Sequence, residues 1–201
     1  NTSEKYYFKS NESLPKPKIV RKREKGIIYS VSSWGGYFYI HTNKGAEDFK
    51  IERSRDIEAS KWEVFIPAKN ETMIGGLTFL KNWIIRSELN NALDKIFVRD
   101  INSNKEEELI FTDEEVYDGC ISLTQKDRNT DLIYISYSTP KTQARTYLYN
   151  LKTKEKKLVK EQVIPTGHDP KNYIVQRIEC NSDDGRKVPL TITRHKDTPL
   201  D

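Results

Sequence analysis

Apolar and polar residues alternate through most of the chain, or apolar residues run in fours and fives, and helical spacing is rare. Alternation is typical of β-strands, because successive side chains of a strand point to opposite faces of a sheet. From residue 27 the alternating segments recur in sets of four, separated by short turns rich in Gly, Asn and Ser. The pattern therefore predicts a β-protein assembled from repeated four-stranded units.

The expected strands form three consecutive sets, each about the size of one propeller blade. Their third strands, around Ile51, Phe97 and Leu148, recur at the interval of roughly 40–50 residues that blade repeats show. The short aromatic strand 5–9, followed by a loop to Lys18, predicts a fragment of an earlier blade. The strands of the three sets are 27–34, 37–42, 49–54 and 62–67; 73–80, 82–89, 94–101 and 107–112; and 117–124, 132–139, 145–151 and 155–161.

The repeat stops at a seam between residues 163 and 173. Pro165 and Pro170 lack backbone donors, and Gly167 permits a positive φ, so the strand ladder must break there. Two further alternating runs, at 174–181 and 187–194, then flank a turn and predict a hairpin of a different kind.

The expected fold class is therefore all-β: a partial, open β-propeller of about three and a half four-stranded antiparallel blades, followed by a terminal β-hairpin. The expected domains are the partial propeller at 1–162, an inter-domain linker at 163–173 and the first strands of a second domain at 174–201. So few blades cannot close a ring, which predicts exposed blade faces and unpaired edges through which copies could associate. Asn1 starts directly on strand-like sequence, so we expect the chain to be part of a longer polypeptide.

Composition excludes several classes of protein. The net charge of +4 is dispersed among 34 basic and 30 acidic side chains, which disfavours nucleic-acid binding. The basic cluster 21–25 contains a Glu and directly precedes a strand, so a strand end or turn is expected there. No apolar run approaches the roughly 20 residues of a membrane helix, and no signal peptide is evident. The widely separated Cys120 and Cys180 favour a reducing, cytoplasmic setting over a disulfide framework or a zinc site.

Nucleophilic catalysis is not indicated by the serines and histidines. A serine hydrolase needs its Ser on a tight turn, a His base and an orienting carboxylate, and the G-x-S-x-G elbow does not occur. Residues 32–36 only superficially resemble that elbow and are expected to form a hairpin turn. His41 lies on an alternating strand, where a hydrogen-bonded or surface imidazole is expected. His168 stands beside Asp169, which is expected to cap a turn, and His195 has no evident partner in sequence.

The remaining chemical candidates also favour structural roles. The carboxylates of 113–115 and 183–184 fall where turns are expected, although acid/base chemistry or cation binding is the alternative. Trp34, Trp62 and Trp83 fall at strand positions that suit blade packing. The sequence contains neither a Walker A run nor a dinucleotide fingerprint. We therefore expect no catalytic, cofactor-binding or metal-binding residue in this chain, and no cofactor.

The seam resembles that of the prolyl oligopeptidase family of serine peptidases, and within it the bacterial oligopeptidase B (protease II) branch. Residues 163–173, VIPTGHDPKNY, resemble the family's Val-Pro-Gly seam, which continues to an Asp and a Tyr. Arg177 and residues 184–190, DGRKVPL, resemble the hairpin that opens the family's peptidase domain. Upstream, residues 29–54 and 135–153 are similar to family blades, so the resemblance covers nearly the whole chain.

The resemblance implies an enzyme with a Ser-Asp-His triad in an α/β-hydrolase domain, capped by a propeller that restricts access to short peptides. Its oligopeptidase B branch cleaves after Arg or Lys. The triad belongs to the part of the family that follows the hairpin, so none of it is carried over to this chain, which alone is expected to be inactive. The implied partners are short basic peptide substrates and the missing peptidase domain. A non-catalytic β-propeller interaction scaffold is the alternative.

Overall fold

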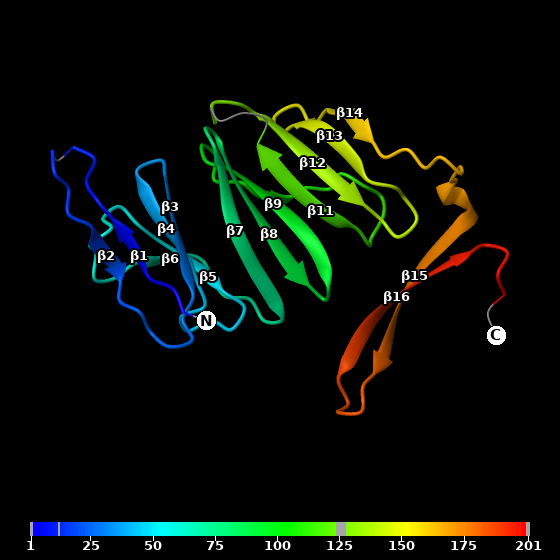
Figure 1. The fold of residues 1–201 in the computed structure, drawn as a ribbon, viewed down its shortest axis with the longest axis horizontal. Helices are drawn as coiled ribbons and strands as arrows, with labels where there is room; N and C mark the ends of the chain where they lie inside the picture. The colour runs from blue at the N-terminus through cyan, green and yellow to red at the C-terminus, as the bar shows by residue number, and fades with distance from the viewer. Residues whose placement is uncertain (1, 12, 124–127, 200–201) are drawn as a thin grey trace. The chain divides into compact units, whose positions relative to one another are not determined.

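The computed structural model describes residues 2–11, 13–123 and 128–199, and its regular elements are β-strands and one short 3-10 helix (Figure 1). Three four-stranded antiparallel sheets have the strand orders β3-β4-β5-β6, β10-β9-β8-β7 and β11-β12-β13-β14, and two-stranded sheets pair β1 with β2 and β15 with β16. The elements are β1 (Lys5–Tyr7), β2 (Lys18–Arg21), β3 (Tyr29–Trp34), β4 (Tyr37–Thr42), β5 (Lys50–Ser54), β6 (Glu63–Ile66), β7 (Thr72–Leu80), β8 (Trp83–Asn90), β9 (Leu93–Asp100), β10 (Glu106–Glu108), β11 (Asp118–Leu123), β12 (Leu132–Ser138), β13 (Arg145–Asn150), β14 (Lys156–Glu161), η1 (Pro170–Asn172), β15 (Tyr173–Asn181) and β16 (Lys187–His195).

This topology confirms the prediction of a partial propeller followed by a hairpin. Each four-stranded sheet is a meander in which consecutive strands pair, and β5, β9 and β13 are the third strands that the repeat indicated. The turn between β8 and β9 illustrates why the meanders form. Asn91 and Ala92 both have positive φ, of 50° and 55°, and two such residues suit the twist of a tight hairpin.

One expected strand and one expected loop need correction. The run 107–112 was expected to be a strand, but β10 ends at Glu108. The Leu109 amide still donates to the Ile96 carbonyl of β9 at 2.7 Å, and the chain then leaves the ladder because Phe111 packs against Tyr117 and Tyr137. The loop was expected to include Lys18, but Lys18 is the first residue of β2, because residues 18–21 form a strand that pairs with β1. Ile19 and Val20 are the β-branched residues that favour this strand.

The chain divides into two compact units, one of residues 1–79 with 85–90 and one of residues 80–84 with 91–201. In the first unit, buried residues lie on both faces of the β3–β6 sheet. Tyr29, Ile40 and Trp62 form a buried cluster, and Ile51 is completely buried on β5. Thr42 is also completely buried, and its hydroxyl donates to the Ile28 carbonyl at 3.0 Å, so the only polar atom of the side chain is satisfied.

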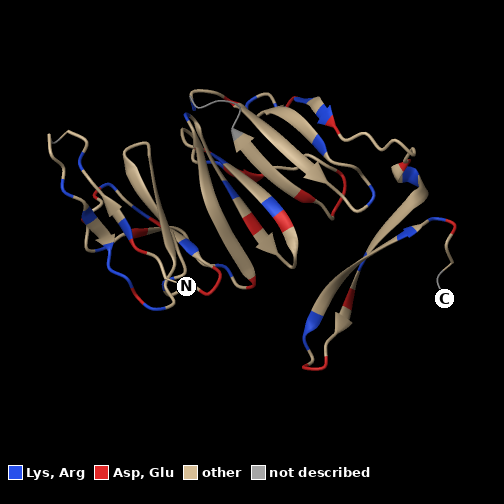
Figure 2. Ribbon diagram, viewed as in Figure 1, with Lys and Arg blue, Asp and Glu red and all other residues tan. Residues whose placement is uncertain are grey.

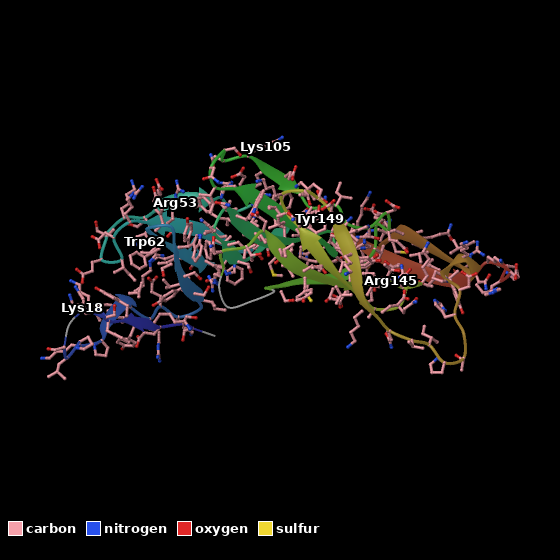
Figure 3. The ribbon with its side chains drawn as sticks, turned by 90° about the horizontal axis from the view of Figure 1, so that it is seen from above. Lys18, Arg53, Trp62, Lys105, Arg145 and Tyr149 are labelled. Carbon is pink, nitrogen blue, oxygen red and sulfur yellow. The ribbon has the colours of Figure 1, made fainter. Side chains whose placement is uncertain are left out.

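In the second unit, β12 shows how the alternating pattern separates the two faces of a blade. Ile133, Ile135 and Tyr137 are buried, whereas Tyr134, Ser136 and Ser138 are half-buried on the other face. Tyr149 on β13 is also buried, and Figure 3 labels its side chain together with that of Arg145 from the same strand. One face of this blade is therefore apolar core, and the opposite face carries polar side chains.

The edges and ends of the chain remain exposed. All six residues of β14 are exposed, as expected for the outer strand of a blade. The strand carries three lysines, and lysines on an edge strand protect it from pairing with other chains. Basic and acidic positions are interspersed along the strands (Figure 2). Within the described residues, the structure contains no helix that is long and apolar enough to span a membrane.

Candidate functional site

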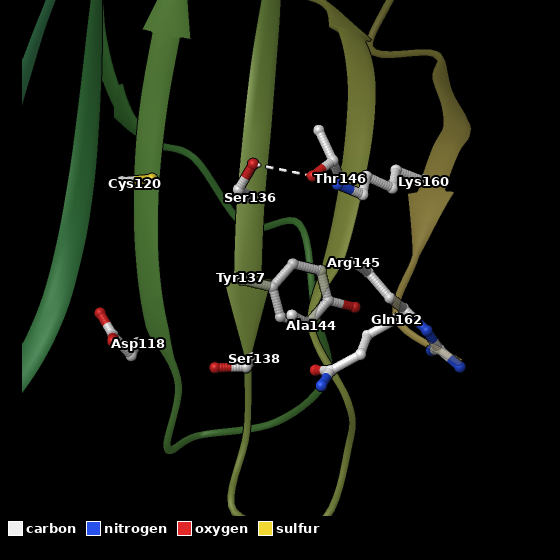
Figure 4. Close-up of a pocket in the computed structure, with 10 residues that line it drawn as sticks. All are labelled: Asp118, Cys120, Ser136, Tyr137, Ser138, Ala144, Arg145, Thr146, Lys160 and Gln162. Atoms are coloured by element: carbon white, nitrogen blue, oxygen red, sulfur yellow. Dashed lines mark hydrogen bonds between the residues drawn. The ribbon is translucent and has the colours of Figure 1, made fainter. Parts of the chain in front are cut away.

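A hollow with a volume of about 440 Å³ lies on the polar face of the β11–β14 sheet (Figure 4). Strand register explains its chemistry. Cys120 is paired with Ser136, Ser136 with Thr146, and Thr146 with Lys160, so these four residues form one row across all four strands. The lining residues are Asp118, Cys120, Ser136, Tyr137, Ser138, Ala144, Arg145, Thr146, Lys160 and Gln162.

Several polar groups of this hollow are already hydrogen-bonded. The hydroxyls of Ser136 and Thr146 are 2.9 Å apart and hydrogen-bonded. Arg145 donates from Nε to Glu161 at 2.6 Å, and this bond holds the pKa of Arg145 above its ordinary value. No His is among the lining residues, so the hydroxyls have no imidazole base within the hollow. The arrangement fits an open blade face, of the kind that a neighbouring blade covers in a closed propeller.

A second hollow, of about 330 Å³, lies beside the loop that follows β10. Its walls combine the aromatic rings of Phe111 and Tyr117 with several carboxylates, among them Asp94, Glu108 and Glu114. Burial raises the pKa of Asp94, with a further contribution from the Asp118 charge, and burial raises the pKa of Tyr117 to about 12. Glu108 and Glu114 are each paired with a lysine at 3.4 Å, so part of the acidic charge is neutralised.

The seam connects this acidic loop to the hairpin. The Thr142 hydroxyl donates to Glu114 at 2.9 Å, and the carbonyl of the neighbouring Lys141 accepts a 2.6 Å hydrogen bond from Nε2 of His168. The His168 ring lies 5.1 Å from the ring of Tyr173, and the His195 ring packs edge-on against Tyr173 at 5.7 Å. Two imidazoles that are 27 residues apart in sequence numbering therefore contact one phenol ring at the base of the hairpin.

Among the described residues, none of the three histidines hydrogen-bonds to a serine hydroxyl. Nε2 of His41 bonds to the Ile74 carbonyl at 2.6 Å, and its ring stacks on Phe49, as expected for a structural imidazole. Burial lowers the pKa of His41. The partner that sequence did not reveal for His195 is Asp197, whose carboxylate lies 3.4 Å from Nδ1. Asp169 caps η1 by accepting from the Lys171 amide at 2.9 Å, as predicted.

The other candidates occupy the expected turns and packing positions. Residues 35 and 36 form the β3–β4 turn with positive φ, which places the exposed Ser32 and Ser33 on β3 and not on an elbow. Asp183 and Asp184 lie in the hairpin turn, where Asp184 accepts from the Arg186 amide at 3.2 Å. In the basic cluster, Arg21 ends β2 and pairs with Glu52 at 2.7 Å.

The tryptophans pack within the blades. Trp62 belongs to the buried cluster of the first unit, and Trp34 stacks on Phe79 with ring centroids 6.1 Å apart. Trp83 is half-buried, and its indole donates to Asp131 at 2.7 Å. Cys120 and Cys180 are both exposed free thiols. Among the described residues, no group of three or more His, Cys, Asp or Glu side chains is arranged to hold a metal ion.

Sequence reasoning missed a buried charge cluster in the first unit. Arg86 and Glu88 on β8 are 5% and 4% exposed, and Nε of Arg86 donates to Glu88 at 2.8 Å. Lys69 donates to both carboxylate oxygens of Glu88 at 2.7 Å. The signal was available in the sequence, because opposite charges two residues apart on a strand share one face.

Comparison with known proteins places these sheets in a family. The family model described as "Prolyl oligopeptidase, N-terminal beta-propeller domain" matches residues 1–162. The chain is 28% identical over 187 residues to dipeptidyl aminopeptidase BI of Pseudoxanthomonas mexicana and 24% identical over 190 residues to Protease 2 of Moraxella lacunata. These alignments cover 91% and 94% of this chain but only 25% and 27% of the relatives, so the chain spans about a quarter of their length.

The fold agrees with this assignment. Oligopeptidase B from Trypanosoma brucei superposes with a TM-score of 0.87 and 24% identity, covering 99% of this chain and 30% of that one. Oligopeptidase B from Leishmania major superposes with a TM-score of 0.79 and 20% identity, covering 98% of this chain and 29% of that one. The chain therefore belongs to the prolyl oligopeptidase family and comprises blades of its N-terminal β-propeller domain.

Proposed function

We propose that this chain is the propeller side of a serine endopeptidase that cleaves short peptides after Arg or Lys. In this proposal the peptidase body continues from the hairpin, with 163–173 as the linker between the two domains and 174–201 as the first strands of the body. The blades restrict entry to short, extended peptides, and the chain by itself is inactive.

The observation that carries the proposal is the extent of the likeness. The family match ends at residue 162, yet the fold likeness to oligopeptidase B covers 99% of the chain and so continues through β15 and β16. A propeller piece with no peptidase attached would need no such hairpin. The polar hollow on the β11–β14 sheet is consistent with this interpretation, because its row of hydroxyl, thiol and ammonium groups includes no imidazole base.

The coding sequence downstream of Asp201 and the activity of its full product test the proposal. The downstream frame should encode a G-x-S-x-G elbow followed by an Asp and a His, in the order of α/β-hydrolases. The full product should cleave a short chromogenic peptide ending in Arg or Lys at least about 100-fold more efficiently than one ending in Pro or Phe, by kcat/KM. Replacing the elbow Ser with Ala should abolish this activity.

Two results would redirect the assignment. Release of dipeptides from peptide N-termini, in preference to cleavage after Arg or Lys, would replace the proposed specificity with the one named in the Pseudoxanthomonas relative. A stop codon with no hydrolase frame would favour a non-catalytic scaffold. Turnover of the Arg peptide by the 201-residue chain itself, sensitive to a serine-directed inhibitor, would contradict the expectation of no catalytic residue here.

A further inference from the structure

The segment 163–172 crosses from β14 to β15 with few polar ties of its own. Its internal hydrogen bonds join the Gly167 amide to the Ile164 carbonyl and the Asn172 amide to the Asp169 carbonyl, each at 3.0 Å, and the Lys171 amide to the Asp169 carboxylate at 2.9 Å. Val163 is 81% exposed, whereas His168 is half-buried within this otherwise mostly exposed segment. The hydrogen bond from His168 to the Lys141 carbonyl therefore ties an exposed segment to the blade.

The loop that receives this bond is itself fixed. Thr139 and Thr142 exchange backbone hydrogen bonds of 3.0 and 3.3 Å, which close residues 139–142 into a tight turn. Thr142 is 6% exposed, and its hydroxyl is held by Glu114 at 2.9 Å. Lys141 is held from the same carboxylate at 3.4 Å. The Lys141 carbonyl is thus a positioned acceptor rather than part of a loose loop.

The other side of the imidazole contacts the hairpin. Tyr173 is the first residue of β15, and its ring packs between His168 and His195, which is the last residue of β16. Because a carbonyl can only accept, Nε2 of His168 must carry the proton in this bond. Gly167, with φ of +80°, makes the turn that aims the ring at the blade.

From this geometry we propose that His168 is a clasp that holds the crossing segment 163–172 against blade loop 139–144 and sets the direction in which the hairpin leaves the blade. The chain of contacts begins at Glu114, which holds Thr142 and Lys141. The Lys141 carbonyl binds His168, and the His168 ring packs against Tyr173. The inference rests on the proposed function for its consequence, since the crossing then orients the peptidase body. The clasp itself is a property of the residues in this chain.

Hydrogen–deuterium exchange of the purified 201-residue chain tests the clasp. In His168→Ala, the hydrogen-bonded amides of Gly167, Lys171 and Asn172 should exchange at least about tenfold faster than in the unchanged chain, because local opening no longer has to break the anchoring bond. His168→Gln should restore slow exchange, since its Nε2 amide can donate from nearly the same position. His195→Ala is the matched control, because it removes the other ring from Tyr173 and leaves the tie to the blade intact.

Core amides of β12 serve as an internal reference for global stability. Faster exchange confined to 164–172 in His168→Ala, with rescue by Gln, would establish the clasp. Unchanged exchange in His168→Ala, or exchange equally fast in His168→Gln and His168→Ala, would overturn it. Absence of peptidase activity in the full product would instead overturn the proposed function and would leave this exchange result unaffected.

Discussion

The blade β3–β6 and the hairpin β15–β16 are both antiparallel and both alternate apolar with polar residues, yet their side chains end in different environments. On β4 and β5, Ile40 and Ile51 are completely buried. In the hairpin, Ile178 and Leu190 sit opposite each other and are 40% and 43% exposed. The hairpin has the longer unbroken register, with nine residue pairs, so hydrogen-bonded pairing alone does not produce a core.

The difference shows what stabilises a blade. A two-stranded ribbon has too little apolar surface of its own to be stable without a covering layer. The even-numbered positions of the hairpin nevertheless share one mostly apolar face. Under the proposed function this face would be covered by the peptidase body. Its members are Ile174, Gln176, Ile178, Cys180, Val188, Leu190, Ile192 and Arg194.

The largest expected contrast between blade and hairpin comes from their ion pairs. Glu88→Ala removes the acceptor shared by the buried Arg86 and by Lys69, and should cost about 3–5 kcal/mol because the buried Arg86 loses an ionic partner. Glu179→Ala breaks the exposed hairpin pair with Lys187 and should cost less than about 1 kcal/mol. Urea unfolding followed by tryptophan fluorescence measures both. Equal costs for the two substitutions would contradict the contrast.

The apolar residues should give the next largest effect. Ile40→Ala removes a completely buried side chain from the cluster with Tyr29 and Trp62, and should cost about 2–5 kcal/mol. Ile192→Ala, at a hairpin position that is 37% exposed, should cost under about 1 kcal/mol in the same chain. The urea midpoint again reports the difference, since Trp62 lies in the affected cluster. A large loss in the Ile192 variant would mean that the hairpin face is already covered.

An intermediate effect is expected at the seam between the two regions. Asp169→Ala removes the cap on η1 and should cost about 1 kcal/mol, whereas Asp169→Asn keeps an acceptor for the Lys171 amide and should cost less. Because η1 directly precedes β15, the loss should be local. Amide exchange at Lys171 and Asn172 should accelerate in the Ala variant while β12 amides are unchanged.

The smallest expected effect is a pH dependence of stability that comes from His41, on strand β4 of the blade. Burial lowers the pKa of His41 below 6.5, so the unfolded chain takes up a proton on this residue more readily than the folded chain. Its contribution to stability is therefore fully present above about pH 6.5 and is lost as the pH falls from there through the lower pKa of the folded chain. Urea midpoints from pH 7.5 down to pH 5 should decline less steeply in His41→Gln. An identical pH dependence in both proteins would refute the assignment.

Much of the fold could be predicted because its signals are local. Alternation located the strands, and Gly35 and Gly36 located a turn that needs positive φ. The prolines and glycine of 163–172 located the break in the ladder. The end of β10 was predicted wrongly for a physical reason: the apolar pattern continues through Leu109 and Phe111, but beyond Leu109 the burial comes from packing and not from strand pairing.

The candidate site was less accessible from sequence, because its parts are distant in the chain. Glu114 and His168 were both named from the sequence, but Glu114 was interpreted as a solvated turn residue and His168 as the neighbour of a capping Asp. Their connection through Lys141 and Thr142 exists only once β12 and β13 bring the 139–144 loop beside both.

The sequence by itself determined the period of the strands, the size of the repeat, the position of the seam and the family resemblance. Each of these depends on residues close together in the chain, where backbone geometry limits the choices. The tertiary structure alone decided which face of each strand is buried, that Arg86 and Glu88 share a dry environment, and that His168 reaches the blade. Alternation defines two faces of a strand but does not say which one will meet a neighbour, and that choice is made by burial against distant segments.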